Sequence, residues 1–395
     1  MAQQRLEERV AMRRSGPRVA EFFAGIGLVR LALEQVGCRV VFANDIALAK
    51  RQLYAANFGC AEYLLADIRS LRGSDVPDIE IATASFPCTD LSLAGGRAGL
   101  RGAHSGMFWE FARVLDGMGE RRPAVVLLEN VAGLASSADG SDLRAVIARL
   151  NDLGYWCDAF LLDARWFVPQ SRPRLFIVGA RQPISSAAPP DGAPCAIGLP
   201  PSDLRPAWLT HFAARHPELL LRALPLQRPP ATLATLADVV ERLAPDDERW
   251  WPAERCNAFA LSLSARNEAR VSLLRRAPRL AWRTAYRRTR HGRAVWEVRP
   301  DQMSGCLRTT RGGSSKQAIV EAGAGQLRVR WMTPTEYARL QGAGGFVFGS
   351  ATPNQVLSAF GDAVCVPVVA WIARQYLVPL LNGHVREQQV RYAAG

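Results

Sequence analysis

The chain has 395 residues, of which 49% are hydrophobic and 22% charged, the balance of a globular protein of roughly two or three domains. It has no run of roughly 18 apolar residues, and its first residues are charged. This argues against a transmembrane helix and a signal peptide and predicts a cytoplasmic protein. The net charge is +13, and nearly all of the excess lies between residues 181 and 330, which favours a polyanion such as nucleic acid as the partner.

Residues 17–182 alternate between short apolar runs and helical patterns. Val19–Phe23 is strand-like, Ala24–Gly27 is a turn, and a helix over 28–36 ends at Gly37. Further strands are predicted at 40–43, 79–84, 124–128 and 174–180. Such alternation with apolar strands predicts an α/β fold in which helices cover a mostly parallel sheet.

The pattern changes after residue 182. Pro, Ala, Ser and Gly dominate residues 182–206, which is typical of a linker or surface loop, and the stretch that follows is rich in Arg and Trp with weak periodicity. A helix start is predicted at Thr333, because Thr is a good N-cap, Pro334 suits the first helical position and Glu336 completes a capping box. The apolar run 364–372 then indicates a return to the α/β core.

The eight cysteines are spread singly along the chain. None forms a Cys-x-x-Cys pair or a Cys/His cluster with zinc spacing, which argues against a metal site and a disulfide framework. Cys88 stands out because it follows Pro87 where the strand 79–84 gives way to a loop. The carboxyl ends of strands are where α/β sheets place ligands, so this thiol is a candidate nucleophile.

A nucleoside site is predicted at the first two strands. The segment Phe23–Gly27 follows a strand and opens a helix, so its glycines allow the backbone to approach a ligand closely. Asp45 ends the next strand about 20 residues later, where a carboxylate can accept hydrogen bonds from ribose hydroxyls. An ordinary tight turn between strand and helix is the alternative interpretation of the glycines.

Charged residues stand at two further strand ends. Glu129 lies at the end of the strand 124–128, and Arg172 and Arg174 precede the apolar run of the last strand. Two arginines that are two positions apart on an extended chain point to the same side, and both can donate hydrogen bonds to a phosphate or a carbonyl oxygen. A solvated carboxylate and an exposed charged loop are the alternatives here.

Taken in chain order, these stretches resemble the DNA (cytosine-5) methyltransferase family of prokaryotic type. The resemblance covers about 18–180 and 300–375. It rests on the segments Phe23–Gly27, Asn44–Asp45, Ala66–Ile68, Phe86–Cys88, Glu129–Val131, Gln170–Arg174, Arg308–Gly313, Arg330–Gly342 and Gly361–Val364.

Two residues depart from the family pattern. Thr89 follows the cysteine where the family often has Gln, and Asp362 stands where it usually has Asn. An ionised Asp accepts hydrogen bonds but cannot donate them, which bears on the geometry of that loop and on cofactor affinity. The residues expected to carry the chemistry are unchanged.

The resemblance implies a Rossmann-like methyltransferase fold with a smaller target-recognition domain. It divides the chain into a catalytic part over 1–182, a target-recognition domain over 183–325 and a return to the catalytic domain over 326–395. It implies S-adenosyl-L-methionine as the cofactor. The cofactor-binding residues that it implies are Phe23, Ala24, Gly25, Gly27, Asp45, Ile46, Asp67, Ile68, Pro87, Asp362 and Ala363.

The resemblance also implies a reaction. The Cys88 thiolate adds to C6 of a cytosine flipped out of the duplex, so that C5 can attack a methyl sulfonium. Glu129 holds N3 and the exocyclic amine, and Arg174, with Arg172 in support, donates to the base O2 or its phosphate. Cys88 then leaves by elimination after the C5 proton has been removed by a base that the sequence does not identify.

DNA contacts are expected from two regions. The glycine-rich stretch 91–105 is expected to close over the flipped base, a plain surface loop being the alternative. The basic run 283–291 is expected to hold phosphates within the target-recognition domain. The predicted DNA-binding residues are Ser92, Arg97, Arg101, Arg287, Arg288, Arg308 and Arg311.

The leading hypothesis is therefore a DNA (cytosine-5) methyltransferase that acts on double-stranded DNA as a monomer, with no membrane association and with a cognate restriction endonuclease as an optional partner. An RNA cytosine-5 methyltransferase on the same fold is a second hypothesis, which the large basic segment disfavours. A catalytically inactive DNA-binding homologue is a third, which the presence of Cys88, Glu129 and Arg174 disfavours. The amino-acid sequence does not indicate which DNA sequence is recognised.

Overall fold

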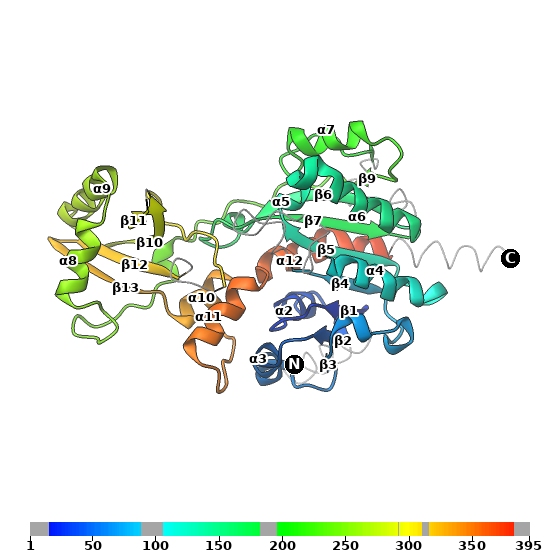
Figure 1. The fold of residues 1–395 in the computed structure, drawn as a ribbon, viewed down its shortest axis with the longest axis horizontal. Helices are drawn as coiled ribbons and strands as arrows, with labels where there is room; N and C mark the ends of the chain where they lie inside the picture. Colours follow the sequence, from blue (N-terminus) through cyan, green and yellow to red (C-terminus); the bar gives the residue numbers. More distant parts are fainter. Residues whose placement is uncertain (1–15, 88–105, 182–195, 291, 310–315, 383–395) are drawn as a thin grey trace, which may run out of the picture. The chain divides into compact units, whose positions relative to one another are not determined.

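The computed structural model describes residues 16–87, 106–181, 196–290, 292–309 and 316–382 (Figure 1). Its internal contacts divide these residues into two compact units. The first unit contains the residues up to 162, those from 173 to 228 and those from 368, and the second contains 163–172 and 229–367.

A seven-stranded sheet in the order β3-β2-β1-β4-β5-β7-β6 forms the centre of the first unit. The neighbours from β3 to β5 pair in parallel, and β7 runs antiparallel to β5. The order reverses between β1 and β4, and open α/β sheets bind ligands at the carboxyl ends of the strands beside such a switch point. The strands are β1 (Arg18–Phe22), β2 (Arg39–Asp45), β3 (Tyr63–Leu65), β4 (Ile81–Ala84), β5 (Val125–Val131), β6 (Trp156–Asp163) and β7 (Pro173–Ala180).

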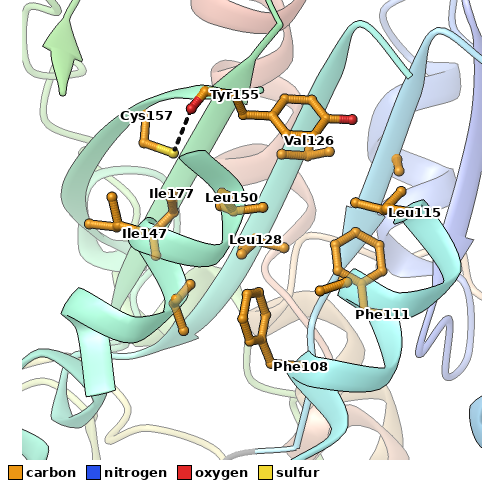
Figure 2. Close-up of a cluster of buried hydrophobic side chains, with 14 of the residues drawn as sticks. Phe108, Phe111, Leu115, Val126, Leu128, Ile147, Leu150, Tyr155, Cys157 and Ile177 are labelled. Atoms are coloured by element: carbon orange, nitrogen blue, oxygen red, sulfur yellow. Dashed lines mark hydrogen bonds between the residues drawn. The ribbon is translucent and has the colours of Figure 1, made fainter. Parts of the chain in front are cut away.

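Helices pack on this sheet through apolar faces. In α4 (Met107–Gly117), Phe108, Phe111 and Leu115 recur at helical spacing and enter the same core as Ile147 and Leu150 of α6 (Ser141–Asp152), which Figure 2 shows beside β5. Burying one such side chain contributes about 1.5–3 kcal/mol, so this core anchors α4 firmly against the sheet. The other helices of the first unit are α2 (Leu28–Glu34), α3 (Leu48–Phe58), α5 (Gly133–Ser136) and α7 (Ala207–Arg215).

Residues 196–228, which include the short pair β8 (Ala196–Ile197) and β9 (Arg222–Ala223), attach to strand β6. A buried ion pair holds them there. The Asp158 carboxylate of β6 accepts hydrogen bonds from the Arg205 guanidinium at 2.5 Å and from the Tyr376 hydroxyl at 2.7 Å. Both partners of the ion pair are almost completely buried.

Replacing Asp158 with alanine should lower the free energy of unfolding by about 3–5 kcal/mol, because the change leaves the buried Arg205 guanidinium without a counter-charge. Glu218→Ala is the matched control. The pair of Glu218 with Arg144 is about half exposed, so this substitution should lower the free energy of unfolding by less than about 1 kcal/mol. Urea denaturation measures the free energy of unfolding of both variants. Equal losses would contradict a stabilising role for the buried ion pair.

The second unit is built on a four-stranded antiparallel sheet in the order β11-β10-β12-β13. One face of this sheet packs on a core that contains Trp251 and Phe259, with Trp296 and Trp331 against them. The strands are β10 (Ala281–Arg290), β11 (Arg293–Val298), β12 (Gln317–Gly323) and β13 (Gln326–Trp331). The helices are α8 (Ala253–Leu261), α9 (Ala265–Arg276), α10 (Pro334–Leu340) and α11 (Pro353–Asp362), and α12 (Val366–Ile372) follows.

The structure confirms the predicted α/β fold with a mostly parallel sheet, and it confirms the helix start at Thr333. The Thr333 side chain accepts a hydrogen bond from the Glu336 N–H, and the Glu336 carboxylate accepts one from the Thr333 N–H. Glu336 also pairs with Arg330 in the interior. The helical run Pro353–Asn382 is long and apolar enough to cross a membrane by composition alone, but 72% of its apolar window is buried, as is common for a core helix.

Candidate active site

The loop Phe23–Gly27, between β1 and α2, contains three residues in the left-handed region. Phe23, Gly25 and Gly27 have φ angles of 56°, 57° and 82°. A Cβ on Gly27 would lie only 2.7–2.8 Å from the rings of Phe58 and Tyr54, so the loop lies against α3 too closely for any side chain there. A non-glycine residue at positive φ, such as Phe23, is strained, and such strain clusters at ligand sites.

The Gly25 peptide is held on both sides. Asp45, the last residue of β2, accepts hydrogen bonds from the N–H groups of Gly25 and Ala47, both at 2.9 Å. On the other side, the Tyr63 hydroxyl donates to the Gly25 carbonyl at 3.3 Å. A carboxylate has about four acceptor positions, so Asp45 retains capacity for further donors such as ribose hydroxyls.

Glu21 lies in β1, two residues before the loop Phe23–Gly27, here called the glycine loop, and its side chain is buried. Neither carboxylate oxygen has a hydrogen-bond partner among the described residues. Burial is the main reason why the pKa of Glu21 rises to about 8, although nearby Arg30 opposes the shift. The raised pKa favours the protonated carboxyl group, which can act as either donor or acceptor.

The remaining predicted cofactor residues of this unit differ in exposure. Ile46 is 66% exposed, whereas Ala24 and Ile68 are buried and Ile68 belongs to the hydrophobic core. Asp67 caps the short 3₁₀ turn that begins at Ile68, and its carboxylate pairs with Arg69 at 2.5 Å. The hydrogen bonds from Arg69 hold the pKa of Asp67 below its usual value. The Ile68 side chain is thus placed for packing, and the exposed apolar surface comes from Ile46.

Glu129 and Arg174 form an ion pair. The Arg174 Nε lies 2.9 Å from the Glu129 Oε1, and the side chains are only 15% and 12% exposed. The antiparallel register of β5 and β7, which sets Val131 opposite Arg174, brings the two side chains together. The sequence predicted both residues, but the pair itself depends on strands that are about 45 residues apart in the chain.

Asn130 fixes the loop after β4. Its side-chain amide donates to the Phe86 carbonyl at 3.2 Å, and its oxygen accepts from the Val131 N–H at 2.9 Å. These bonds attach the segment that leads to the exposed Pro87 to the end of β5. Asn130 was missing from the predicted site residues, although its place beside Glu129 could have suggested it. Cys88 follows Pro87 and lies outside the described residues.

Arg172 has different partners from Arg174. Its side chain is buried, and its guanidinium donates to the backbone carbonyls of Leu307 at 3.0 Å, Gly361 at 3.3 Å and Ala363 at 2.7 Å. The guanidinium is therefore engaged by the backbone of the second unit. Asp362, between two of these carbonyls, is exposed, and Ala363 is half-buried.

Three of the predicted DNA-binding residues can be described. Arg288 is exposed on β10, with its guanidinium 4.9 Å from the centre of the Tyr286 ring, Arg287 is half-buried, and Arg308 is exposed. The others, Ser92, Arg97, Arg101 and Arg311, lie outside the described residues. Among the described residues there is no group of three His, Cys, Asp or Glu side chains able to hold a metal ion.

The fold is the one found in methyltransferases of known structure. The Dnmt2 methyltransferase of S. pombe matches 92% of this chain and 99% of its own at a TM-score of 0.59 and 19% identity. The methyltransferase EhMeth of Entamoeba histolytica matches 93% of this chain and 98% of its own at a TM-score of 0.62 and 13% identity. At these identities the likeness concerns the fold.

Within this class, the chain belongs to the C-5 cytosine-specific DNA methylase family, whose model matches residues 17–377. The type II methyltransferase M.NgoBI of Neisseria gonorrhoeae is 37% identical over 163 residues, 41% of this chain and 50% of that protein. The type II methyltransferase M.HhaI of Haemophilus parahaemolyticus is 33% identical over 172 residues, 43% of this chain and 51% of that protein. The chain spans about half the length of the curated relatives it matches. The predicted family is confirmed.

Proposed function

We propose that the chain is a DNA (cytosine-5) methyltransferase that transfers a methyl group from S-adenosyl-L-methionine to cytosines within a short duplex sequence. The observation that carries this proposal is the largely shielded pair of Glu129 and Arg174, in a chain of the C-5 cytosine-specific DNA methylase family. The pair and the segment that leads to Cys88 lie at the carboxyl ends of β4 and β5, the edge where open α/β sheets bind their ligands.

The residues at the ends of β1 and β2 suit S-adenosyl-L-methionine. Asp45 offers acceptors for the ribose hydroxyls, the exposed Ile46 offers an apolar surface for the adenine, and Asp67 offers an acceptor for its amine. The buried Glu21 has two oxygens without partners among the described residues, which suits a polar ligand group beside the glycine loop. When bound, the cofactor supplies a methyl group on a sulfonium. Phe23, Ala24, Gly25, Gly27, Ile68, Pro87, Asp362 and Ala363 complete the proposed cofactor-binding set.

Cys88 adds as a thiolate to C6 of the flipped base, which makes C5 nucleophilic. Negative charge builds up on the ring as the thiolate adds. Glu129 relieves it when the carboxyl group carries a proton that it shares with N3, and the positive charge of Arg174 stabilises it further. Because Arg174 binds the Glu129 carboxylate, it also fixes the orientation of that group. These roles need a water-poor site, which the low exposure of both side chains supports.

The basic residues of the chain hold the DNA in this proposal. Residues 183–325 act as the target-recognition domain, and their antiparallel sheet presents Arg287 and Arg288. Arg308 and Arg311 lie in the chain between β11 and β12 of this sheet. Ser92, Arg97 and Arg101 contact the DNA from the stretch after Cys88. The concentration of positive charge after residue 181 supports this assignment.

The cellular setting is also a proposal. The chain acts in the cytoplasm as a monomer on double-stranded DNA, with a cognate restriction endonuclease as an optional partner. For the endonuclease partner, the support is that the curated relatives carry type II methyltransferase names.

Incubation with methyl-labelled S-adenosyl-L-methionine tests the substrate. We expect label in unmethylated genomic DNA, and none in the same DNA after the chain has already methylated it to completion. Bulk tRNA serves as the competing substrate. Labelling of tRNA without labelling of DNA would replace the proposal by an RNA methyltransferase.

Tyr63→Phe should weaken binding of S-adenosyl-L-methionine by about 3- to 10-fold, because the Gly25 carbonyl loses its hydroxyl donor, one of the hydrogen bonds that hold the loop Phe23–Gly27. Calorimetric titration of the DNA-free protein measures this affinity. Tyr155→Phe is the matched control, since that buried hydroxyl donates to the Pro123 carbonyl at 2.9 Å and lies in the core. If both variants bind the cofactor like the wild type, Tyr63 has no role in the loop.

A further inference from the structure

Three buried polar side chains of the second unit join segments that are far apart in the sequence. Gln170, Arg172 and Gln341 are all at most 3% exposed. Burying such groups costs free energy unless each finds hydrogen-bond partners. Their hydrogen bonds therefore show which segments these side chains connect.

Gln170 connects the segment before β7 to two other segments. Its side-chain amide donates to the Leu340 carbonyl at 2.8 Å, and its oxygen accepts from the Leu307 N–H at 3.1 Å. Gln341, the neighbour of Leu340, donates to the carbonyls of Phe360 at 2.8 Å and Ala363 at 3.1 Å. Through these two amides the end of α10 is bonded to the end of α11 and to residue 307.

Arg172 makes the most direct link. One terminal nitrogen donates to the Leu307 carbonyl and lies 3.2 Å from the Cys306 sulfur, and the other donates to the carbonyls of Gly361 and Ala363. A single planar guanidinium therefore spans two segments, residues 306–309, here called the DNA segment, and residues 361–363, here called the cofactor loop. The proposed DNA contact Arg308 and the proposed cofactor contacts Asp362 and Ala363 lie on these two segments.

The two segments also touch directly. A Cβ on Gly361 would lie 2.2 Å from the Arg308 carbonyl carbon and 2.6 Å from the Thr309 nitrogen. Real side chains never approach backbone so closely, so the two segments fit together only because Gly361 lacks a side chain. At this point the two segments are in close backbone contact.

We propose that Arg172 is a positioning residue that holds the cofactor loop and the DNA segment in register, so that binding of cofactor and of DNA both depend on it. The inference rests on the proposed function and replaces the predicted supporting contact of Arg172 with the substrate. Its terminal nitrogens already donate to three backbone carbonyls, which argues for a role through the backbone. Lysine carries the same charge without the planar fork, so it cannot serve both segments.

Arg172→Lys is the test. The dissociation constant for S-adenosyl-L-methionine is measured by calorimetry without DNA, and KM for unmethylated genomic DNA and kcat are measured at saturating cofactor. We expect the cofactor dissociation constant and the KM for DNA each to rise about 10-fold, with kcat within about 3-fold of the wild type. An unchanged cofactor dissociation constant would overturn the proposal, whether DNA binding falls or not, because a substrate contact predicts a loss confined to DNA or to kcat.

Two further variants complete the design. Arg165→Gln is the matched control, since Arg165 lies in the same segment but is half exposed and pairs with Asp163, so both affinities should stay within about 2-fold. Gly361→Ala removes no polar side chain but forces the two segments apart, so it should reproduce the double loss. Thermal unfolding measures the folded fraction of each variant, and each affinity is calculated for the folded protein alone.

Failure of the proposed function is distinguishable from failure of this inference. If the wild type transfers no methyl group to DNA, the proposed function fails. The cofactor dissociation constants of Arg172→Lys and Gly361→Ala still show whether cofactor binding depends on how Arg172 positions the cofactor loop against the DNA segment.

Discussion

Replacing Cys88 with alanine is expected to lower kcat for methyl transfer to DNA by at least about 10⁴-fold, with cofactor and duplex affinities within about 3-fold of the wild type. The reason is chemical. C5 of cytosine is a poor nucleophile until a thiolate adds at C6, and alanine has no atom that can add. Binding depends on other residues, so the loss should appear in kcat alone. Labelled transfer under single-turnover conditions measures it.

Cys60→Ala is the control for this variant, because Cys60 is an exposed cysteine in the first unit outside the proposed site. It should keep full activity. Substantial methyl transfer by Cys88→Ala, or an equal loss in Cys60→Ala, would contradict covalent catalysis by Cys88.

The second large effect is expected from Glu129→Gln. Glutamine preserves the shape and can still accept a hydrogen bond from Arg174, but it cannot share a proton with the base. General acid–base groups typically contribute about 10²- to 10⁴-fold, so kcat should fall by that range while the KM for cofactor stays nearly constant. The first-order rate of transfer from a preformed complex with DNA isolates the chemical step.

Glu120→Gln is the matched control. Glu120 also faces an arginine, Arg181 at 3.5 Å, but its side chain is 95% exposed. Its replacement should leave kcat unchanged. A Glu129→Gln variant with wild-type kcat would remove Glu129 from the chemistry and leave its pair with Arg174 as a structural feature only.

Much of the fold could be predicted because its signals are local. The apolar runs that became β1, β2, β4, β5 and β7 end in turn residues, and the capping box at Thr333 lies within four residues. Glycine at positive φ and an acid at the next strand end are likewise local features, so the glycine loop and Asp45 were accessible to sequence reasoning.

The strands of the second sheet were not predicted, for a physical reason. The central strand β12 is buried on both faces, and β10 and β13 mix arginine with apolar residues. Ala285 of β10 enters the aromatic core, while Trp282 on the opposite face donates to Glu321 and stacks with Arg242. Clean alternation of apolar and polar residues arises only when one face meets water.

Contacts between residues that are distant in the chain were also missed. Tyr63 holds the Gly25 carbonyl from 38 positions along the chain, and no motif marks it. Arg172 belongs to a recognisable motif, but its partners at Leu307, Gly361 and Ala363 depend on tertiary structure. A motif identifies which residue matters, and only the fold shows which atoms it contacts.

The position of the transferred methyl group tests the central claim most directly. Unmethylated genomic DNA is treated with the wild-type protein and S-adenosyl-L-methionine, hydrolysed to nucleosides for identification of the methylated base, and mapped by conversion sequencing. The account predicts 5-methylcytosine, confined to one short sequence, and none with Cys88→Ala. Methylation on an exocyclic amine of cytosine or adenine, or no methylation of DNA at all, would contradict it.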